Sequence, residues 1–205
     1  MRGRSINLKH YFLKEINPVI RFLILSDLIL TGAAGLLGPI FAIFIEDFIE
    51  GGNAAVAGVS AGVYLFSKSL LQIPIAHLID TIQGEKDDFW FMFLFTVLIA
   101  MTPILYLFIS TPLELYLVQF FLGLCTAFTF PTFMAIFTRH IDKHMEGTEW
   151  GVYFTVTDIS SAGMALVGGY IAVSSGFPIL ITILTILSLF GALALLPLKP
   201  YIRIR

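Results

Sequence analysis

Six long apolar stretches, separated by short polar or charged turns, are the feature that most limits how this chain can fold. They cover roughly residues 18–44, 54–79, 89–109, 115–137, 150–173 and 177–196. A helix that crosses the hydrocarbon core of a bilayer needs about 20 residues, so each stretch is long enough to span a membrane. The sequence therefore predicts an all-α, polytopic membrane protein with six transmembrane helices.

The composition agrees with this class. Of the 205 residues, 58% are hydrophobic and 13% are charged, whereas soluble domains have roughly 45–50% apolar and about 25% charged residues. We expect residues 1–205 to form one transmembrane domain, with a basic interfacial segment at 1–17 and a cytoplasmic tail at 197–205. The first apolar stretch is longer than the core of a signal peptide, so we expect it to be retained as a span.

Lysines and arginines predict the orientation, because short cytoplasmic loops of membrane proteins carry an excess of them. The chain has 12, and all but Lys68 lie at the two ends of the chain or in the second-to-third and fourth-to-fifth turns. These segments share one side of a six-span chain, while the turns on the other side carry only acidic residues. We therefore expect a plasma (inner) membrane protein with both termini in the cytoplasm.

Three charged residues lie well inside the predicted spans, namely Asp27, Lys68 and Asp158. An ionisable side chain is costly inside a bilayer, so it usually has a partner or lines a pathway for a solute or ion. The three depths agree to within a turn or two of helix. Lys68 is therefore predicted to pair with one of the two aspartates, and both a role in transport and a purely structural ion pair remain open.

A weak internal repeat relates the first and fourth spans. Asp27 lies twelve residues before Pro39, Gln119 lies twelve residues before Pro131, and the segments that follow read PIFAIF and PTFMAIF. The matching spans run in opposite directions across the membrane. This arrangement predicts a 3+3 inverted repeat, which is common in secondary transporters, and makes Gln119 a candidate transport residue together with Asp27.

Small residues recur at every fourth position of the second and fifth spans. They are Ala54, Gly58 and Gly62, and Ser161, Ala165 and Gly169, with Gly168 next to the last of them. Small side chains at this spacing let two helices approach closely. We interpret the glycines as packing positions, at an outer gate or at an interface between two halves, without ligand chemistry.

The sequence has none of the motifs that indicate catalysis or binding of a cofactor. We find no nucleophile elbow, phosphate loop or pair of catalytic carboxylates, and we predict no enzyme activity, no cofactor and no nucleic-acid partner. His140, Asp142, His144 and Glu146 are of the residue types that bind metals. Because their spacing is equally that of a solvated charged loop, we predict no metal site.

Three short segments resemble motifs of the major facilitator superfamily. The family loop G-x-x-x-D-R-x-G-R-R is similar to AHLIDTIQGEK at 76–86, which keeps Asp80 and, with one inserted residue, Gly84 and Lys86. The family patterns R-x-x-x-G and G-P-x-x-G-G are similar to QFFLG at 119–123 and MALVGG at 164–169. The departures include the first glycine of the loop motif, the arginine after its aspartate, the span-four arginine and the span-five proline, and the lost span-four arginine weakens an assignment of proton-coupled antiport.

The resemblance covers nearly the whole chain and is to one six-helix half of that family. It implies a secondary transporter of a small solute that works by alternating access, with a second copy of the chain or another six-helix half completing a central cavity. We expect Asp80, Gly84 and Lys86 to form a gating loop, with Asp80 near residues 147–150 of its own or a partner chain, because the partial positive charge of a helix N-terminus favours an anion there.

In a homodimer, Lys68 of one copy would face Asp158 of the other, whereas the rival arrangement pairs Lys68 with Asp27 of its own chain. A different class of function also remains open. In this alternative, the chain is a membrane scaffold, an assembly partner or a lipid-moving protein that keeps the same fold. A polar, water-accessible cavity lined by Asp27 and Gln119 would favour transport, and a dry, packed face there would favour a scaffold.

Overall fold

The computed structural model describes residues 16–81 and 84–202, and this part of the chain is helical without strands. Its elements are α2 (Pro18–Leu37), the 3-10 helix η1 (Gly38–Ile40), α3 (Phe41–Phe48), α4 (Ala54–Thr81), α5 (Glu85–Leu105), α6 (Pro112–His140), α7 (Glu146–Ser175), α8 (Phe177–Leu193) and the 3-10 helix η2 (Leu196–Tyr201). They make six units that are long and apolar enough to cross a membrane. The predicted fold class is therefore confirmed, and so is the position of every span to within a few residues.

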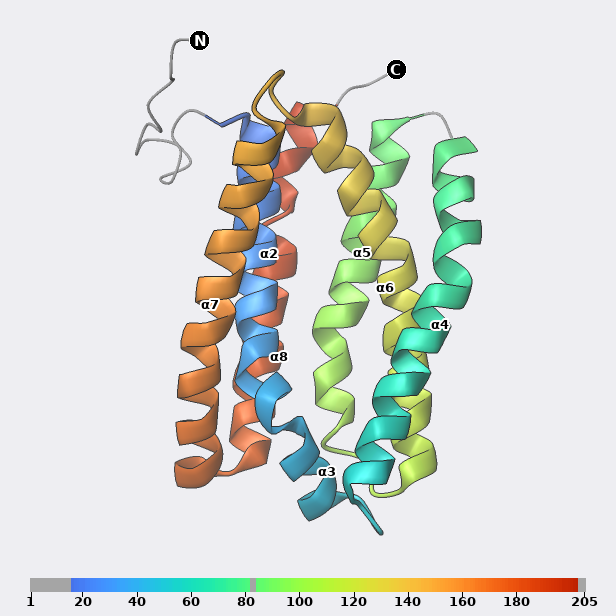
Figure 1. The fold of residues 1–205 in the computed structure, drawn as a ribbon, viewed down its shortest axis with the longest axis vertical. Coiled ribbons are helices and arrows are strands. Elements are labelled where there is room, and N and C mark those ends of the chain that lie inside the picture. Colours follow the sequence, from blue (N-terminus) through green and yellow to red (C-terminus); the bar gives the residue numbers. More distant parts are fainter. Residues whose placement is uncertain (1–15, 82–83, 203–205) are drawn as a thin grey trace.

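The six spans lie side by side in two groups (Figure 1). In one group α2 packs against α7 and α8, and in the other α6 packs against α4 and α5. Contacts between α5 and α8 join the two groups. On the face seen in Figure 1, α7 and α4 form the two outer edges, so they are separated by the rest of the molecule.

Two spans begin about four residues earlier than the sequence analysis predicted, because charged residues assigned to turns are helical. Helix α5 begins at Glu85 and α7 begins at Glu146, with acidic residues in the first turn of each. Negative charge is favourable there because the free N–H groups give a helix N-terminus a partial positive charge. The prediction failed at these boundaries because it treated charge alone as a sign of a loop.

The first span is interrupted, whereas the fourth is continuous. The α-helical geometry of α2 stops at Leu37, and residues Gly38–Ile40 form the 3-10 turn η1 before α3 resumes. Pro39 lacks the N–H group that an α-helix would use at this position. Helix α6, in contrast, runs on through Pro131. The inverted repeat that matched these two spans stays a prediction.

Two apolar clusters hold the ends of the helix bundle together. One contains Ile20 of α2, Phe137 of α6, and Leu198 and Ile202 near the C-terminus. We call this end, where α2 begins and η2 ends, the terminal end. Leu198 is fully buried and Ile202 is 7% exposed, so both pack against the bundle, and the cytoplasmic tail expected at 197–205 stays a prediction. The predicted interfacial segment at 1–17 lies almost entirely outside the described residues.

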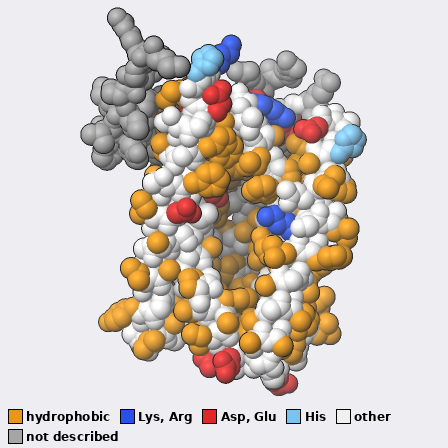
Figure 2. All heavy atoms as spheres, in the orientation of Figure 1, with side chains coloured by type: hydrophobic (Ala, Val, Ile, Leu, Met, Phe, Trp, Pro, Cys, Tyr) orange, Lys and Arg blue, Asp and Glu red, His pale blue; other side chains and the backbone are white. Residues whose placement is uncertain are grey.

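Charges divide between the two ends of the bundle as the sequence predicts. Apart from Lys68, the basic residues that the structure describes lie at the terminal end, and they are Arg21, Lys86, Arg139, Lys143 and Lys199. The exposed residues at the opposite end include Glu46, Asp47, Glu50 and Glu114. In Figure 2 the side chains at the bottom are red, whereas blue and red side chains lie together at the top.

Close contacts between helices depend on glycines. A Cβ on Gly168 of α7 would overlap the carbonyl oxygen of Leu36 in α2, and a Cβ on Gly123 of α6 would overlap Ser67 of α4. The other predicted packing glycines, Gly58, Gly62 and Gly169, have no heavy atom within 4 Å of such a Cβ. Gly168 thus packs inside the chain, while a packing role for the other three stays a prediction.

We expect the substitution Gly168→Ala to lower the free energy of unfolding by about 1–3 kcal/mol, the usual cost of overpacking, since the new methyl group would overlap backbone atoms of Leu36. Gly169→Ala is the matched control. Its methyl group meets no neighbour, and alanine is the better helix former by about 1 kcal/mol. Thermal unfolding in detergent measures both variants, and equal melting temperatures would contradict the assignment.

Candidate functional site

A cavity of about 460 Å³ lies between the two groups of helices. Every spanning unit contributes to its wall, from Asp27 of α2 to Ser188 of α8. Figure 2 shows that the face between α7 and α4 is hollowed at mid-height. Most lining residues are apolar or aromatic, with a small number of polar groups among them. A largely apolar pocket with a few placed polar groups is typical of a binding site for a small molecule.

Asp27 lies in the wall of this cavity and contacts the neighbouring helix α7. One carboxylate oxygen, Oδ2, accepts a hydrogen bond from the Tyr153 hydroxyl at 2.7 Å. About two turns further along α7, the Ser160 hydroxyl donates to the backbone carbonyl of Leu28 at 3.0 Å. Close packing of α2 on α7 therefore fixes the Asp27 carboxylate. Because Tyr153 bonds one of the two carboxylate oxygens, part of the hydrogen-bonding capacity of the carboxylate stays available toward the cavity.

Gln119 lies in the wall of the same cavity, on α6. Its side chain is buried, and Nε2 donates a hydrogen bond to the Tyr106 hydroxyl at 3.3 Å. The structure thus brings together the two residues that the sequence matched at equivalent positions. Asp27 belongs to one group of helices and Gln119 to the other, and both border one shared space.

Lys68 lies near the cavity but has a different partner from those predicted. Its ammonium nitrogen is 4.8 Å from the ring centroid of Phe130, which lines the cavity, and a cation over an aromatic face is attracted to it. Within the described residues Lys68 makes no ion pair, so the pairing with Asp27 in one chain is not formed. Asp158 is exposed on α7, across the molecule from α4 (Figure 1). Its pairing with Lys68 of another copy stays a prediction.

The predicted gating residues lie at the terminal end. Asp80 is exposed near the end of α4, Gly84 immediately precedes α5, and Lys86 is exposed in the first turn of α5. The end of α4 and the start of α7 lie on opposite sides of the molecule (Figure 1). A contact of Asp80 with residues 147–150 is therefore not formed within the chain, and a contact with a partner chain stays a prediction.

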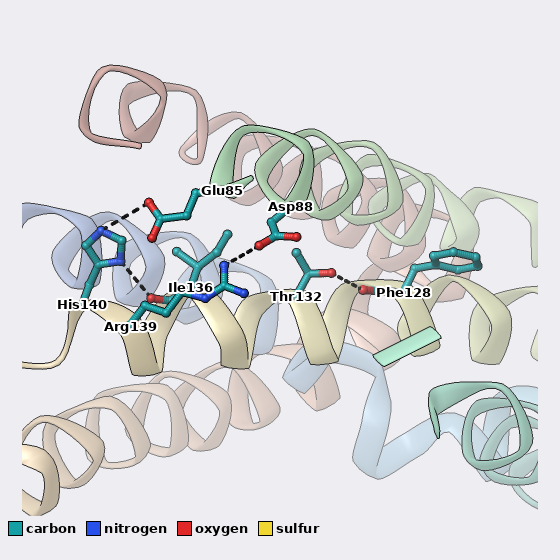
Figure 3. Close-up of polar contacts among 7 residues, drawn as sticks. All are labelled: Glu85, Asp88, Phe128, Thr132, Ile136, Arg139 and His140. Carbon is teal, nitrogen blue, oxygen red and sulfur yellow. Dashed lines mark hydrogen bonds and ion pairs between the residues drawn. The ribbon is translucent and has the colours of Figure 1, made fainter. Parts of the chain in front are cut away.

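A polar cluster that the sequence analysis missed joins α5 to α6 at the terminal end (Figure 3). Arg139 Nη1 donates to Asp88 Oδ2 at 2.5 Å. His140 Nδ1 lies 3.0 Å from the carbonyl oxygen of Ile136, and Nε2 lies 3.8 Å from Glu85 Oε2. Asp88 is 1% exposed and His140 is 6% exposed, so the interpretation of both residues as parts of solvated loops is wrong.

A signal for this cluster was present in the sequence. Acidic residues open the third span and basic residues close the fourth, and antiparallel neighbours bring these two ends together. Because the sequence does not state which spans are neighbours, these complementary charges could not be assigned to each other from the sequence. Only the packing of α5 on α6 turns two charged segments into one ion-paired cluster.

Comparisons with known proteins agree with this architecture. The family model described as Major Facilitator Superfamily matches residues 23–203. The chain is also similar to the multidrug resistance protein MdtG of Rahnella sp. (strain Y9602), with 24% identity over 198 residues that cover 91% of this chain and 45% of MdtG. The chain thus spans about half the length of that relative. Because the family match takes in all six spans, the chain belongs to the major facilitator superfamily.

Proposed function

We propose that this chain is one six-helix half of a secondary membrane transporter, which moves an apolar solute with one positive charge by alternating access. The observation that carries the proposal is the cavity of about 460 Å³, which holds both Asp27 and Gln119 in its wall. A scaffold that merely kept the fold would need no such cavity between its two groups of helices. A second half closes the open side of the cavity, and the two halves rock to expose it to each side in turn.

The chemistry of the cavity wall supports the class of solute. Among the residues that line the cavity in the described structure, Asp27 is the only carboxylate and none is basic. Six lining residues are aromatic, namely Phe41, Tyr64, Tyr106, Phe130, Phe133 and Tyr153. A carboxylate and aromatic faces both attract a cation, and the apolar remainder favours a hydrophobic body. The name of the relative MdtG, a multidrug resistance protein, agrees with an apolar cavity of this kind.

Asp27 also supports a mechanism of energy coupling. A proton and a cationic solute compete for one carboxylate, because a protonated carboxyl group no longer attracts a positive charge. Release of the solute on one side of the membrane and of the proton on the other would then couple their movements. The hydrogen bond from Tyr153 links the protonation of Asp27 to α7, because the phenol donates to this carboxylate and lines the same cavity.

We expect the purified protein to bind tetraphenylphosphonium, a hydrophobic cation, and the substitution Asp27→Asn to weaken this binding about tenfold or more. Two unit charges about 5 Å apart attract by about 3 kcal/mol at an effective dielectric constant of about 20, and each 1.4 kcal/mol is a factor of ten. Binding to the wild type should weaken as pH falls and Asp27 takes up a proton, whereas the variant should lose this pH dependence. Equilibrium binding of the radiolabelled cation measures both effects.

The control for this experiment is Asp47→Asn, which removes one exposed carboxylate at the far end of α3 and should leave the affinity unchanged. Triphenylphosphine oxide, which is neutral, should bind wild type and Asp27→Asn equally. An unchanged affinity for tetraphenylphosphonium in Asp27→Asn, or an equal loss in Asp47→Asn, would refute the role of Asp27.

We further propose that two copies of the chain form the working unit, with α4 of each copy against α7 of the other. Only 11% of the residues in the apolar windows of α4 and of α7 are buried within the chain, against 33–44% in the other spans. These two helices carry Lys68 and Asp158, neither of which makes an ion pair among the described residues, and six of their glycines have no heavy atom within 4 Å of an added Cβ. A two-fold axis would make the two α4–α7 contacts identical.

In this dimer, Lys68→Ala and Asp158→Ala should each raise the dissociation constant of the dimer about tenfold or more. Each variant removes two symmetric polar contacts, and such contacts in membranes contribute about 0.6–1.7 kcal/mol apiece. The swap of Lys68→Asp with Asp158→Lys should recover part of the loss. Single-molecule photobleaching in lipid nanodiscs gives the fraction of dimer. A wild-type monomer, or a dimer indifferent to all three variants, would contradict the arrangement.

We place the terminal end on the cytoplasmic side of the plasma (inner) membrane, and with it both termini, because it carries the described basic residues other than Lys68. In a background in which the buried Cys125 is replaced by alanine, Glu50→Cys and Lys143→Cys report on the two sides. A membrane-impermeant maleimide should label Glu50→Cys on intact cells and Lys143→Cys only after permeabilisation. The reverse pattern would overturn the orientation.

A further inference from the structure

A second pocket, of about 290 Å³, lies at the terminal end and away from the central cavity. Lys86 and Phe89 of α5 line one side, and Lys199, Pro200 and Ile202 at the end of the chain line the other. Phe89 and Ile202 are buried, whereas both lysines are exposed. The pocket therefore has an apolar inner surface and two cationic side chains at its rim.

The two lysines are arranged around one aromatic ring. Lys86 and Trp90 are four residues apart on α5, so they share one face of the helix. The ammonium nitrogen of Lys199 lies 5.4 Å from the ring centroid of Trp90. Trp90 is itself exposed to 43% and lies near the end of a span, where tryptophan is enriched because its ring suits the headgroup layer.

Neighbouring acidic side chains are largely held elsewhere. Glu85 and Asp88, in the same first turn of α5, point toward α6, where they contact His140 and Arg139 (Figure 3). Asp87, next to Lys86 in the sequence, is the remaining acidic residue of this turn. The contacts with α6 thus engage two of the three acidic side chains of this turn on the side of the neighbouring helix.

We propose that this pocket binds an anionic phospholipid, with the headgroup phosphate between Lys86 and Lys199. Basic pockets at the ends of membrane helices bind anionic headgroups, and long lysine side chains reach from apolar surface to the headgroup layer. The apolar inner surface fits the glycerol and first acyl carbons that follow the phosphate in a lipid, whereas a free phosphate ion would leave it unused. The bound lipid would bridge α5 and η2, and so stabilise the end of the chain against the bundle.

The test is titration of the purified, full-length protein with phosphatidylglycerol, followed by native mass spectrometry. Lys86→Gln and Lys199→Gln should each raise the dissociation constant about fivefold, the effect of one basic residue near an anionic membrane surface. Lys143→Gln removes an exposed lysine from the same end but outside the pocket, and it should change the constant less than twofold. Lys86→Arg and Lys199→Arg keep the charge and should retain binding.

Two further measurements identify the ligand. Phosphatidylglycerol should raise the melting temperature of the wild type more than phosphatidylcholine does, and the rise should shrink in the two glutamine variants. Inorganic phosphate at millimolar concentration should give no rise. Equal binding by wild type and both glutamine variants, an equal loss in Lys143→Gln, or protection by inorganic phosphate matching that of the lipid would overturn the proposal.

Discussion

The lack of water in the core of a bilayer is the constraint on which the rest of this structure depends. Backbone N–H and C=O groups must be satisfied within the chain there, so each span is a helix. Because lipid tails are as apolar as the side chains, packing between helices depends on close fit. Gly168 against Leu36 and Gly123 against Ser67 supply that fit for α2 with α7 and for α4 with α6, and the two resulting groups leave a cavity between them.

The polar side chains of the cavity are fixed by the same packing. The hydrogen bond from Tyr153 to Asp27 lies within one group of helices, and the bond from Gln119 to Tyr106 lies within the other. Neither bond crosses the open face. A second half could therefore close that face without breaking either interaction, and this is a requirement for a cavity that opens and closes repeatedly.

Apolar packing holds both ends of the bundle, and the terminal end adds ion pairs to it. At the terminal end, Arg139 and His140 of α6 engage Asp88 and Glu85 of α5. At the opposite end, aromatic rings of α3 and α8 pack edge-on, as Phe44 does against Phe177 at 5.6 Å between centroids. Charged groups can be paired where headgroups and water are near, whereas aromatic packing needs no such surroundings. The lysine-lined pocket adds the proposed lipid contact to the charged end.

The sequence by itself determined the fold class, the number and position of the spans and the uneven distribution of charge, because each depends only on the local pattern of apolar and charged residues. It also singled out Asp27 and Gln119, since a charged or polar group inside a span is unusual wherever it lies. Tertiary structure alone decided their neighbours. It set Asp27 against Tyr153, kept Lys68 apart from Asp27, buried Asp88 beside Arg139 and packed Leu198 and Ile202 into the core. These outcomes depend on which helices touch and at what rotation, and the apolar pattern of a membrane helix does not specify either, because its lipid-facing and protein-facing sides are equally hydrophobic.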